Sequence, residues 1–295
     1  MSNKEILKEA IDLHVHVGPE IIPRRYNLTR LIKSEKGKIR GVGIKNHFFP
    51  TKAMDRNENG GLLIIDSVTL NNYLGGFNNN AIKASAGLSG FPIIVWFPTI
   101  NARQFLKTAK YEIPEEWIGQ KNRKKIKLCP AKEIKGLTVF NETKKISEEV
   151  KKVLKTIKEY KAILATGHIS WQETDELVKW AIERTGIKKT IITHPLYQKI
   201  DMPLEKQKEL AEMGALIEFC YSTYSIDKIP ISKIAEQIKY LGAKKCILTS
   251  DIGQVFSKSP SQALLDFMIL LEKEGISKKE LKVMLVDNPN WLLFK

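Results

Sequence analysis

The chain of 295 residues predicts an α/β fold, a single (β/α)8 TIM barrel with an insertion after its fourth strand. Eight short runs rich in Val, Ile and Leu follow one another along the chain, and near-continuous apolar content is typical of parallel strands covered on both faces. Segments with helical start and stop signals separate most of these runs, and eight such β/α units imply a closed barrel. The length suits either one barrel or two smaller domains, and the repeated pattern favours one domain over 1–295.

The eight predicted strands span 10–16, 40–47, 62–70, 92–98, 161–167, 189–194, 214–220 and 245–251. Three of the helices have recognisable ends, because Ser and Glu three residues apart form a capping box and Gly commonly follows a last turn. These helices cover 171–185, between the Ser170–Glu173 box and Gly186; 260–274, from Pro260 to Gly275; and the last segment, after the Ser277–Glu280 box.

The spacing of strands breaks once, over residues 101–146, where we expect an inserted loop and hairpin. This segment holds Trp117, the basic run QKNRKKIK and the stretch IKGLTVFNETKKIS, whose Asn-Glu turn between short apolar pieces predicts the hairpin. It follows the fourth strand, on the side of a barrel where loops carry function. The insertion is either a lid or a solvated excursion, and we favour the lid.

Composition argues against a membrane protein, a secreted protein and a nucleic-acid-binding protein. No apolar run approaches the roughly 18 residues of a membrane span, and the N-terminus, which mixes Lys and Glu, leaves no room for a signal peptide. We therefore expect a cytoplasmic protein. The net charge of +15 comes from lysines interleaved with Glu, as in EEVKKVLKTIKEY, which indicates a solvated surface and predicts neither a nucleic-acid nor a membrane partner.

The three cysteines, Cys129, Cys220 and Cys246, have no CxxC spacing, which argues against a disulfide framework and a thiolate metal site. Cys220 and Cys246 lie in apolar runs and are expected to be buried structural thiols.

All five histidines lie at or just beyond the ends of predicted strands. They are His14, His16, His47, His168 and His194, and Asp251 ends the eighth strand in the same way. Imidazole nitrogens and a carboxylate converging on one point suit a divalent transition metal. A single His in such a position is more often a packed or capping residue, but the shared placement of all five predicts a metal-dependent enzyme.

The segments DLHVH, GH, THP and SD at the first, fifth, sixth and eighth predicted strands resemble the metal-binding landmarks of the amidohydrolase superfamily. The C-terminal DNPNWLLF also resembles the segment that opens the closing helix in many members. An H-x-H alone is a weak signal, whereas H-x-H with two later His and a final Asp is specific for the superfamily, although not for a substrate. The resemblance implies that His14, His16 and Asp251 bind one ion, while His168 and His194 bind a second or orient the substrate.

Residue spacing explains this chemistry. Side chains two apart on a strand point to the same side, so His14 and His16 can bind one ion together. Asp251, from the neighbouring last strand of a closed barrel, can reach the same ion and accept a proton from water. A bound metal lowers the pKa of water from about 15.7 toward about 7, so the resemblance implies hydrolysis by metal-activated water. The alternative for Asp251 is an ordinary helix N-cap.

The sequence departs from the superfamily pattern at the bridging position. The common two-metal form uses a carboxylated Lys or a Glu from the fourth strand, and IIVWFPT contains neither. The second strand instead offers Lys45 and His47, two apart and therefore on one face. Lys45 is expected to point into the barrel beside the metal site, with Glu218 or an anion as partner. Its role is a carbamate bridge, an electrophile for the substrate carbonyl, a charge that holds a ligand, or a plain ion pair, and the number of ions stays open.

Further polar residues are expected to bind substrate. Arg24 and Arg25 follow the first strand, and a guanidinium there suits a carboxylate or phosphate, although both are equally well explained as surface residues. Asn71 ends the third strand, and His47 ends the second. Glu218 lies inside the seventh strand, where it pairs with Lys45 or assists a second metal.

We therefore expect a metal-dependent hydrolase that acts on an amide, lactone or ester bond of a small polar substrate. The arginines of the first loop leave an anionic substrate as an option. Zn²⁺ is the first choice for one or two ions, and Mn²⁺ or Fe²⁺ would also suit the donors. Two alternatives are phosphoester hydrolysis on the same site and a barrel that holds a metal or ligand without turnover. The sequence does not decide whether the protein is a monomer or a homo-oligomer.

Overall fold

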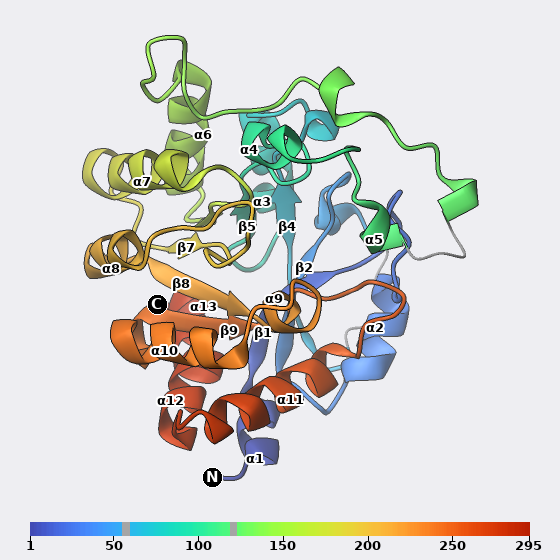
Figure 1. Ribbon diagram of the computed structural model, residues 1–295, viewed down its shortest axis with the longest axis vertical. Coiled ribbons are helices and arrows are strands. Elements are labelled where there is room, and N and C mark those ends of the chain that lie inside the picture. Colours follow the sequence, from blue (N-terminus) through green and yellow to red (C-terminus); the bar gives the residue numbers. More distant parts are fainter. Residues whose placement is uncertain (55–59, 119–122) are drawn as a thin grey trace.

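The computed structural model describes residues 1–54, 60–118 and 123–295. Its paired strands are parallel and neighbour one another in chain order. They are β1 (Ile11–His16), β2 (Gly41–Lys45), β3 (Leu63–Ile65), β4 (Ser67–Thr69), β5 (Ile94–Trp96), β6 (Ile163–Ala165), β7 (Thr190–Ile192), β8 (Leu216–Cys220) and β9 (Cys246–Thr249). In Figure 1 the strands occupy the middle of the molecule with helices around them.

The first and last strands meet, which closes the barrel. Val15 forms a parallel bridge with Ile252, just beyond β9, and the His16 backbone N–H donates to the Ile252 carbonyl at 2.7 Å. The Asp251 backbone N–H donates to the carbonyl of His14 at 2.9 Å. This seam places the H-x-H pair of β1 directly beside Asp251, as the barrel prediction required.

The predicted third strand is interrupted at Asp66, which separates β3 from β4. Beside the interruption, the Thr51 hydroxyl accepts from the Ser67 backbone N–H at 2.7 Å and lies 3.2 Å from a carboxylate oxygen of the buried Asp66. The Thr51 side chain thus takes the place of a neighbouring strand as the hydrogen-bond partner of the Ser67 N–H. The Ser67 hydroxyl then donates to the carbonyl of Ile44 at 2.6 Å, which keeps β4 next to β2. The other seven predicted strands each contain one observed strand.

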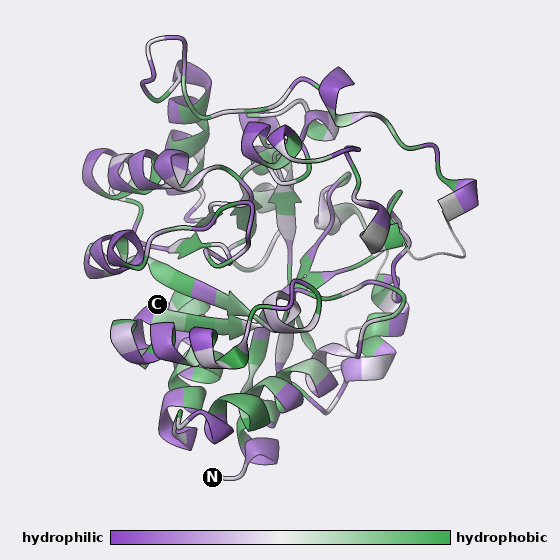
Figure 2. Cartoon of the chain, in the orientation of Figure 1, coloured by the Kyte–Doolittle hydropathy of each residue, from purple (hydrophilic) through white to green (hydrophobic). Residues whose placement is uncertain are grey.

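The helices surround the barrel with their apolar faces inward, and Figure 2 shows the hydrophilic residues on their outer faces. Outside the insertion they are α1 (Asn3–Glu9), α2 (Leu28–Glu35), α3 (Asn79–Gly87), α6 (Glu148–Glu159), α7 (Trp171–Lys179), α8 (Leu204–Glu212), α9 (Tyr221–Ser225), α10 (Ile231–Leu241), α11 (Pro260–Lys273), α12 (Lys278–Lys282) and α13 (Asn288–Phe294). Both predicted capping boxes are present, and π-helical turns extend α7 and join α12 to α13.

The long connection between β5 and α6 covers residues 101–146, the segment for which we predict an insertion, and residues 119–122 of it lie outside the described residues. It holds two short helices, α4 (Arg103–Lys107) and α5 (Glu115–Ile118), and two 3-10 turns. The expected hairpin is reduced to a turn closed by one isolated bridge, Phe140 to Ile146, because the Asn141 side chain accepts from backbone N–H groups inside the turn. Trp117 of α5 reaches the barrel mouth, 6.2 Å from the ring of His47 between centroids.

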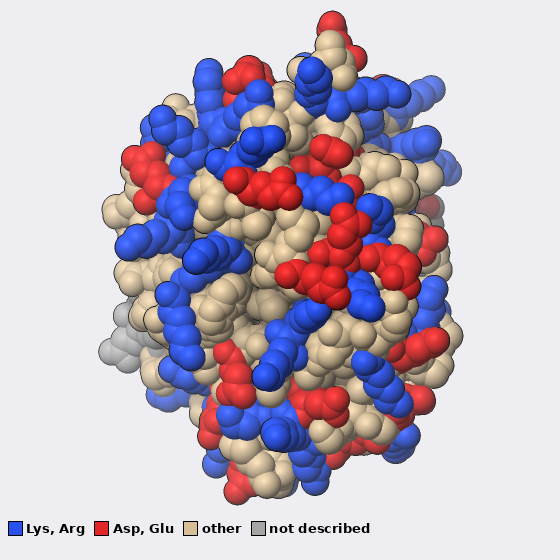
Figure 3. Space-filling model, turned by 90° about the vertical axis from the view of Figure 1, so that its left-hand side faces the viewer, with Lys and Arg blue, Asp and Glu red and all other residues tan. Residues whose placement is uncertain are grey.

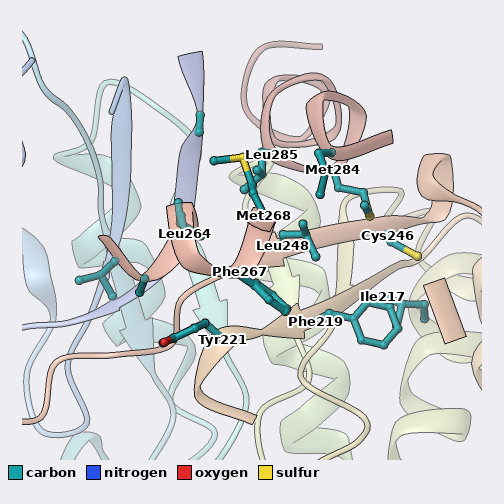
Figure 4. Close-up of a cluster of buried hydrophobic side chains, with 14 of the residues drawn as sticks. Ile217, Phe219, Tyr221, Cys246, Leu248, Leu264, Phe267, Met268, Met284 and Leu285 are labelled. Carbon is teal, nitrogen blue, oxygen red and sulfur yellow. The ribbon is translucent and has the colours of Figure 1, made fainter. Parts of the chain in front are cut away.

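The core beside the seam is tightly packed. Figure 4 shows side chains from β8, α9, β9, α11 and the turn before α13 meeting in one cluster. Its labelled members are Ile217, Phe219, Tyr221, Cys246, Leu248, Leu264, Phe267, Met268, Met284 and Leu285. Cys220 and Cys246 are buried, as predicted, whereas Cys129 is exposed. This packing fixes the end of β9, from which Asp251 follows.

Basic and acidic side chains are interspersed on the face drawn in Figure 3. Across the described residues, none of the helices has both the length and the apolar character that a membrane crossing requires.

Candidate active site

A cavity of about 40 Å³ opens at the C-terminal ends of the strands. It is lined by His16, Arg24, His47, Trp117, His168, His194, Tyr197, Ser222, Ile226, Asp227, Asp251 and Gln254. His194 and Asp251 both have positive φ angles, 25° and 47°, which non-glycine residues rarely adopt. Such strained backbone persists only where the surrounding structure holds it in place, and it is concentrated at functional sites.

His14, fully buried behind this cavity, contacts three charged side chains. Its Nδ1 lies 3.0 Å from Oε1 of Glu218. Its Nε2 lies 3.0 Å from both Oδ1 of Asp251 and Nζ of Lys45. A carboxylate can only accept a hydrogen bond and an ammonium can only donate one, yet a single ring nitrogen cannot satisfy both at once.

Asp251 joins the two histidines of the H-x-H motif. Its Oδ1 lies 3.0 Å from Nε2 of His14 and 3.0 Å from Nε2 of His16, and Oδ2 accepts from the hydroxyl of Ser222 at 2.8 Å. Ligand atoms around a tetrahedral ion with bonds of about 2.0–2.1 Å lie about 3.3 Å apart. The three residues predicted for the first ion therefore already form a group of the right size, with their ligand atoms all within 4.8 Å of one another.

The N-cap alternative for Asp251 is wrong. The helix that follows is α11, which begins at Pro260 and is capped by Ser259, not by Asp251. Gly253 allows the chain after β9 to pass close to the backbone of β1. Its φ is 153°, and a Cβ at this position would lie only 2.3 Å from the carbonyl oxygen of His16.

The electrostatics favour the ionised form of Asp251 and the neutral forms of His16 and His194, which are the forms that bind a metal. Burial raises the pKa of Asp251, but the charge and hydrogen bonds of His14 and His16 outweigh it and hold the pKa well below its ordinary value. Burial, together with the charge of Arg24, holds the pKa of His16 well below its ordinary value, and burial lowers the pKa of His194 to about 4. Burial also lowers the pKa of His14, but Asp251 and Glu218 outweigh it and raise the pKa overall.

Lys45 points into the barrel, as predicted, and only 1% of it is exposed. Its ammonium nitrogen contacts Nε2 of His14 and lies 4.2 Å above the ring of Trp96. Glu218, the expected partner, instead meets the opposite nitrogen of His14, so His14 lies between the two charges. Burial lowers the pKa of Lys45 to about 8, with Asp251 and Glu218 opposing the shift.

His168 and His194 lie side by side across the cavity, with ring centroids 4.9 Å apart. Both Nδ1 atoms are buried without a hydrogen-bond partner among the described residues. Within that part of the chain, neither belongs to a group of three close ligand atoms. The predicted second pair is thus brought together, but without a third protein ligand.

A second cluster surrounds Arg24 and includes Glu20, which sequence reasoning missed. Arg24 pairs with Glu20, and its Nη2 lies 3.2 Å from Nδ1 of both His16 and His47. His16, Glu20 and His47 also form a group of close ligand atoms. The only signal in the sequence is the spacing of Glu20 four residues before Arg24, which is too common to identify a site.

A third group of close ligand atoms comprises His14, Glu218 and Cys220. Burial raises the pKa of the Cys220 thiol well above its ordinary value, so this sulfur is a poor thiolate ligand.

Two residues predicted to bind substrate do not line the cavity. Arg25 is exposed and donates to the carbonyl of Ser257 at 2.6 Å, because loop pairing turns it toward the segment after β9. Asn71 is fully buried and donates to the carbonyl of His47 at 3.1 Å, while its side-chain oxygen accepts from the backbone N–H of Thr99 at 2.9 Å. Both predictions are corrected: Arg25 and Asn71 hold loops together.

Solved structures with the same fold cover nearly all of this chain. An amidohydrolase from Pseudomonas aeruginosa superposes with a TM-score of 0.62 at 10% identity, over 99% of this chain and 97% of its own. An amidohydrolase from Mycoplasma synoviae gives 0.58 at 15%, over 98% and 89%. A beta-aspartyl dipeptidase from Fervidobacterium islandicum AW-1, solved with a beta-Asp-Leu dipeptide, gives 0.59 at 17%, over 97% and 73%. These likenesses confirm the predicted amidohydrolase-type barrel.

No curated protein sequence is significantly similar to this chain. Residues 9–218, from β1 to β8, match the sequence model of one protein family. That span contains both histidines of the H-x-H motif and Lys45, His168 and His194, whereas Asp251 follows it. The chain belongs to this family, which is described as a family of unknown function (DUF6282).

Proposed function

We propose that this protein is a metal-dependent hydrolase that cleaves an amide, lactone or ester bond of a small polar substrate. His14, His16 and Asp251 would hold the ion, and zinc suits a set of two imidazoles and one carboxylate best, with Mn²⁺ and Fe²⁺ as further candidates. The barrel shared with amidohydrolases supports this proposal at the level of fold.

The crowding at Nε2 of His14 carries the proposal. With a hydrogen on Nδ1 bonded to Glu218, the Nε2 lone pair points toward the same space as Oδ1 of Asp251. A divalent cation there would bind both the lone pair and the carboxylate. A hydrogen on Nε2 would instead satisfy the carboxylate but face the ammonium of Lys45, which only donates. A carboxylate behind a ligating histidine is the usual way in which proteins orient such a ligand. The residues therefore fit a metal ion.

A bound divalent ion would polarise the scissile carbonyl and activate water. The chain's own groups supply the rest. Oδ2 of Asp251, held by Ser222, is the oxygen available to take and return a proton. Lys45, with a pKa of about 8, lies beside the same histidine and can stabilise a developing oxyanion or, once carboxylated, become a ligand. His168 and His194 face the other side and would orient substrate or hold a second ion.

Elemental analysis of protein expressed with zinc supplied tests the proposal first. We expect about one equivalent or more in the wild type, and loss of most of it in the His14→Ala/His16→Ala variant with the circular dichroism spectrum retained. Metal-loaded protein is then screened against panels of amides, lactones, esters and phosphoesters. Less than a few tenths of an equivalent in the wild type would overturn the metal site, and metal without turnover on any panel would favour a binding protein.

A further inference from the structure

Arg24 lies inside the active site and is held there by three side chains. Its side chain is 2% exposed and pairs with Glu20, which is fully buried. Nη2 lies 3.2 Å from Nδ1 of His16 and 3.2 Å from Nδ1 of His47. Nη1 is buried and has no hydrogen-bond partner among the described residues. The Nε edge of the guanidinium is therefore paired with a carboxylate, while the Nη1 and Nη2 edge still has hydrogen-bond donors without an anionic partner among the described residues.

The contact between Arg24 and His16 conflicts with metal binding. A guanidinium only donates, so Nδ1 of His16 must accept, and the ring hydrogen lies on Nε2, facing Asp251. When Nε2 instead binds an ion, the neutral ring carries its hydrogen on Nδ1. Two donors would then face each other across 3.2 Å, and Nη2 of Arg24 must leave.

We propose that Arg24 is an anion-binding residue that metal loading releases, and that the substrate carries a carboxylate next to the scissile bond. This inference rests on the metal site of the proposed function. Glu20 keeps the charge of Arg24 paired through Nε, so Nη2 can move without leaving a buried charge alone. Nη1 and Nη2 then form the planar fork that binds a carboxylate through two parallel hydrogen bonds.

The position of Arg24 suits this role. It lines the cavity together with His16, His47 and Asp251, so an anion that enters meets the guanidinium beside the ion site. The chain also supplies a matched control in Arg25, which is exposed and bonded to the carbonyl of Ser257.

The first experiment measures zinc affinity by chelator competition in wild type, Arg24→Met and Arg25→Met. Removing the donor that competes for His16 should tighten zinc binding about tenfold in Arg24→Met, which corresponds to about one charged hydrogen bond, and leave Arg25→Met at the wild-type value. Because Arg24→Met removes the cation that pairs with the buried carboxylate of Glu20, Arg24→Met/Glu20→Gln removes both charges and serves if the single variant does not fold. Unchanged or weaker binding in both Arg24 variants would overturn the inference.

The second experiment uses acetate as probe and acetamide as its uncharged isostere. Binding of a carboxylate and of zinc should reinforce each other, and such coupling is reciprocal. We expect acetate to tighten zinc binding in the wild type and Arg25→Met, acetamide to have no effect, and Arg24→Met to lose the acetate effect. An equal acetate effect in Arg24→Met would show direct coordination of the ion and reject the role of Arg24. A wild type that binds no zinc would overturn the proposed function as well.

Discussion

Nδ1 of His14 lies 3.0 Å from Oε1 of Glu218, although the two residues are 204 positions apart in the chain. Glu218 is fully buried, and the hydroxyl of Thr249 donates to the same oxygen at 2.9 Å. The carboxylate therefore has a fixed position and fixes the histidine in turn. This geometry favours Glu218 as the residue that orients His14, rather than as a ligand of a second ion.

Replacement of Glu218 by Gln should lower zinc affinity by about 10–100-fold, the usual loss when the partner of a ligating histidine is changed. The amide keeps the volume and an acceptor oxygen, but it lacks the negative charge that strengthens the hydrogen bond from Nδ1 and raises the basicity of the ligating nitrogen. Affinity is measured by chelator competition. Glu212→Gln, which alters a half-exposed glutamate near Lys245, is the matched control and should bind as the wild type does. Equal affinities in the two variants would contradict the orienting role.

Asp251→Asn should reduce turnover of any substrate found by at least about 10²-fold, the lower range for loss of a general base. The amide also weakens the ligand at Oδ1. Ser222→Ala, which removes only the donor to Oδ2, should have a smaller effect on turnover and leave zinc content unchanged. Unchanged turnover in Asp251→Asn would show that this side chain neither binds the ion nor moves a proton.

Lys45→Met should stabilise the metal-free protein at pH 7. The pKa of Lys45 is about 8 in the folded state and 10.5 ordinarily, so the unfolded chain binds this proton more tightly. The resulting destabilisation is complete below pH 8 and fades as the pH rises from 8 to 10.5. We expect a gain of about 1–3 kcal/mol at pH 7 that shrinks at pH 10, measured by urea unfolding with EDTA present.

The control for Lys45→Met is Lys244→Met, which changes an exposed lysine and should not alter stability at either pH. A Lys45→Met variant that is less stable than wild type at pH 7 would mean that the attraction of Asp251 and Glu218 outweighs burial.

Asn71→Ala should destabilise the fold without changing zinc affinity. The substitution leaves the carbonyl of His47 and the backbone N–H of Thr99 without this partner, and a buried unpaired polar group costs about 1–3 kcal/mol. Asn72→Ala, at the exposed neighbouring position, should change stability by less than about 0.5 kcal/mol. Loss of zinc affinity with unchanged stability would show that Asn71 acts in the active site and not only in holding loops together.

The barrel and the central part of the site were predictable from local pattern. Each strand is an apolar run, and in a closed parallel barrel all strand ends meet at one face, so His14, His16 and Asp251 had to converge once the fold was right. The inward direction of Lys45 followed from strand alternation in the same way. In each case a short-range periodicity determines the position of the side chain.

The loop residues could not be predicted in this way. Arg24 and Arg25 are adjacent and chemically identical, yet one enters the cavity and the other bonds to Ser257, because tertiary pairing between the first and last loops decides their directions. Glu20 has no pattern that distinguishes it from a surface acid. The break at Asp66 likewise depends on Thr51, whose hydroxyl reaches the strand from another loop.

The bridge between Val15 and Ile252 has a consequence for the order of events during synthesis. The two histidines of the H-x-H motif leave the ribosome before Asp251, which follows His16 by 235 positions. Until then the nascent chain lacks Asp251 of the candidate ion site, and its first strand lacks the neighbour that follows β9. An ion held by His14, His16 and Asp251 could therefore bind only after the last strand has formed, and it would also link the first and last strands of the newly made barrel.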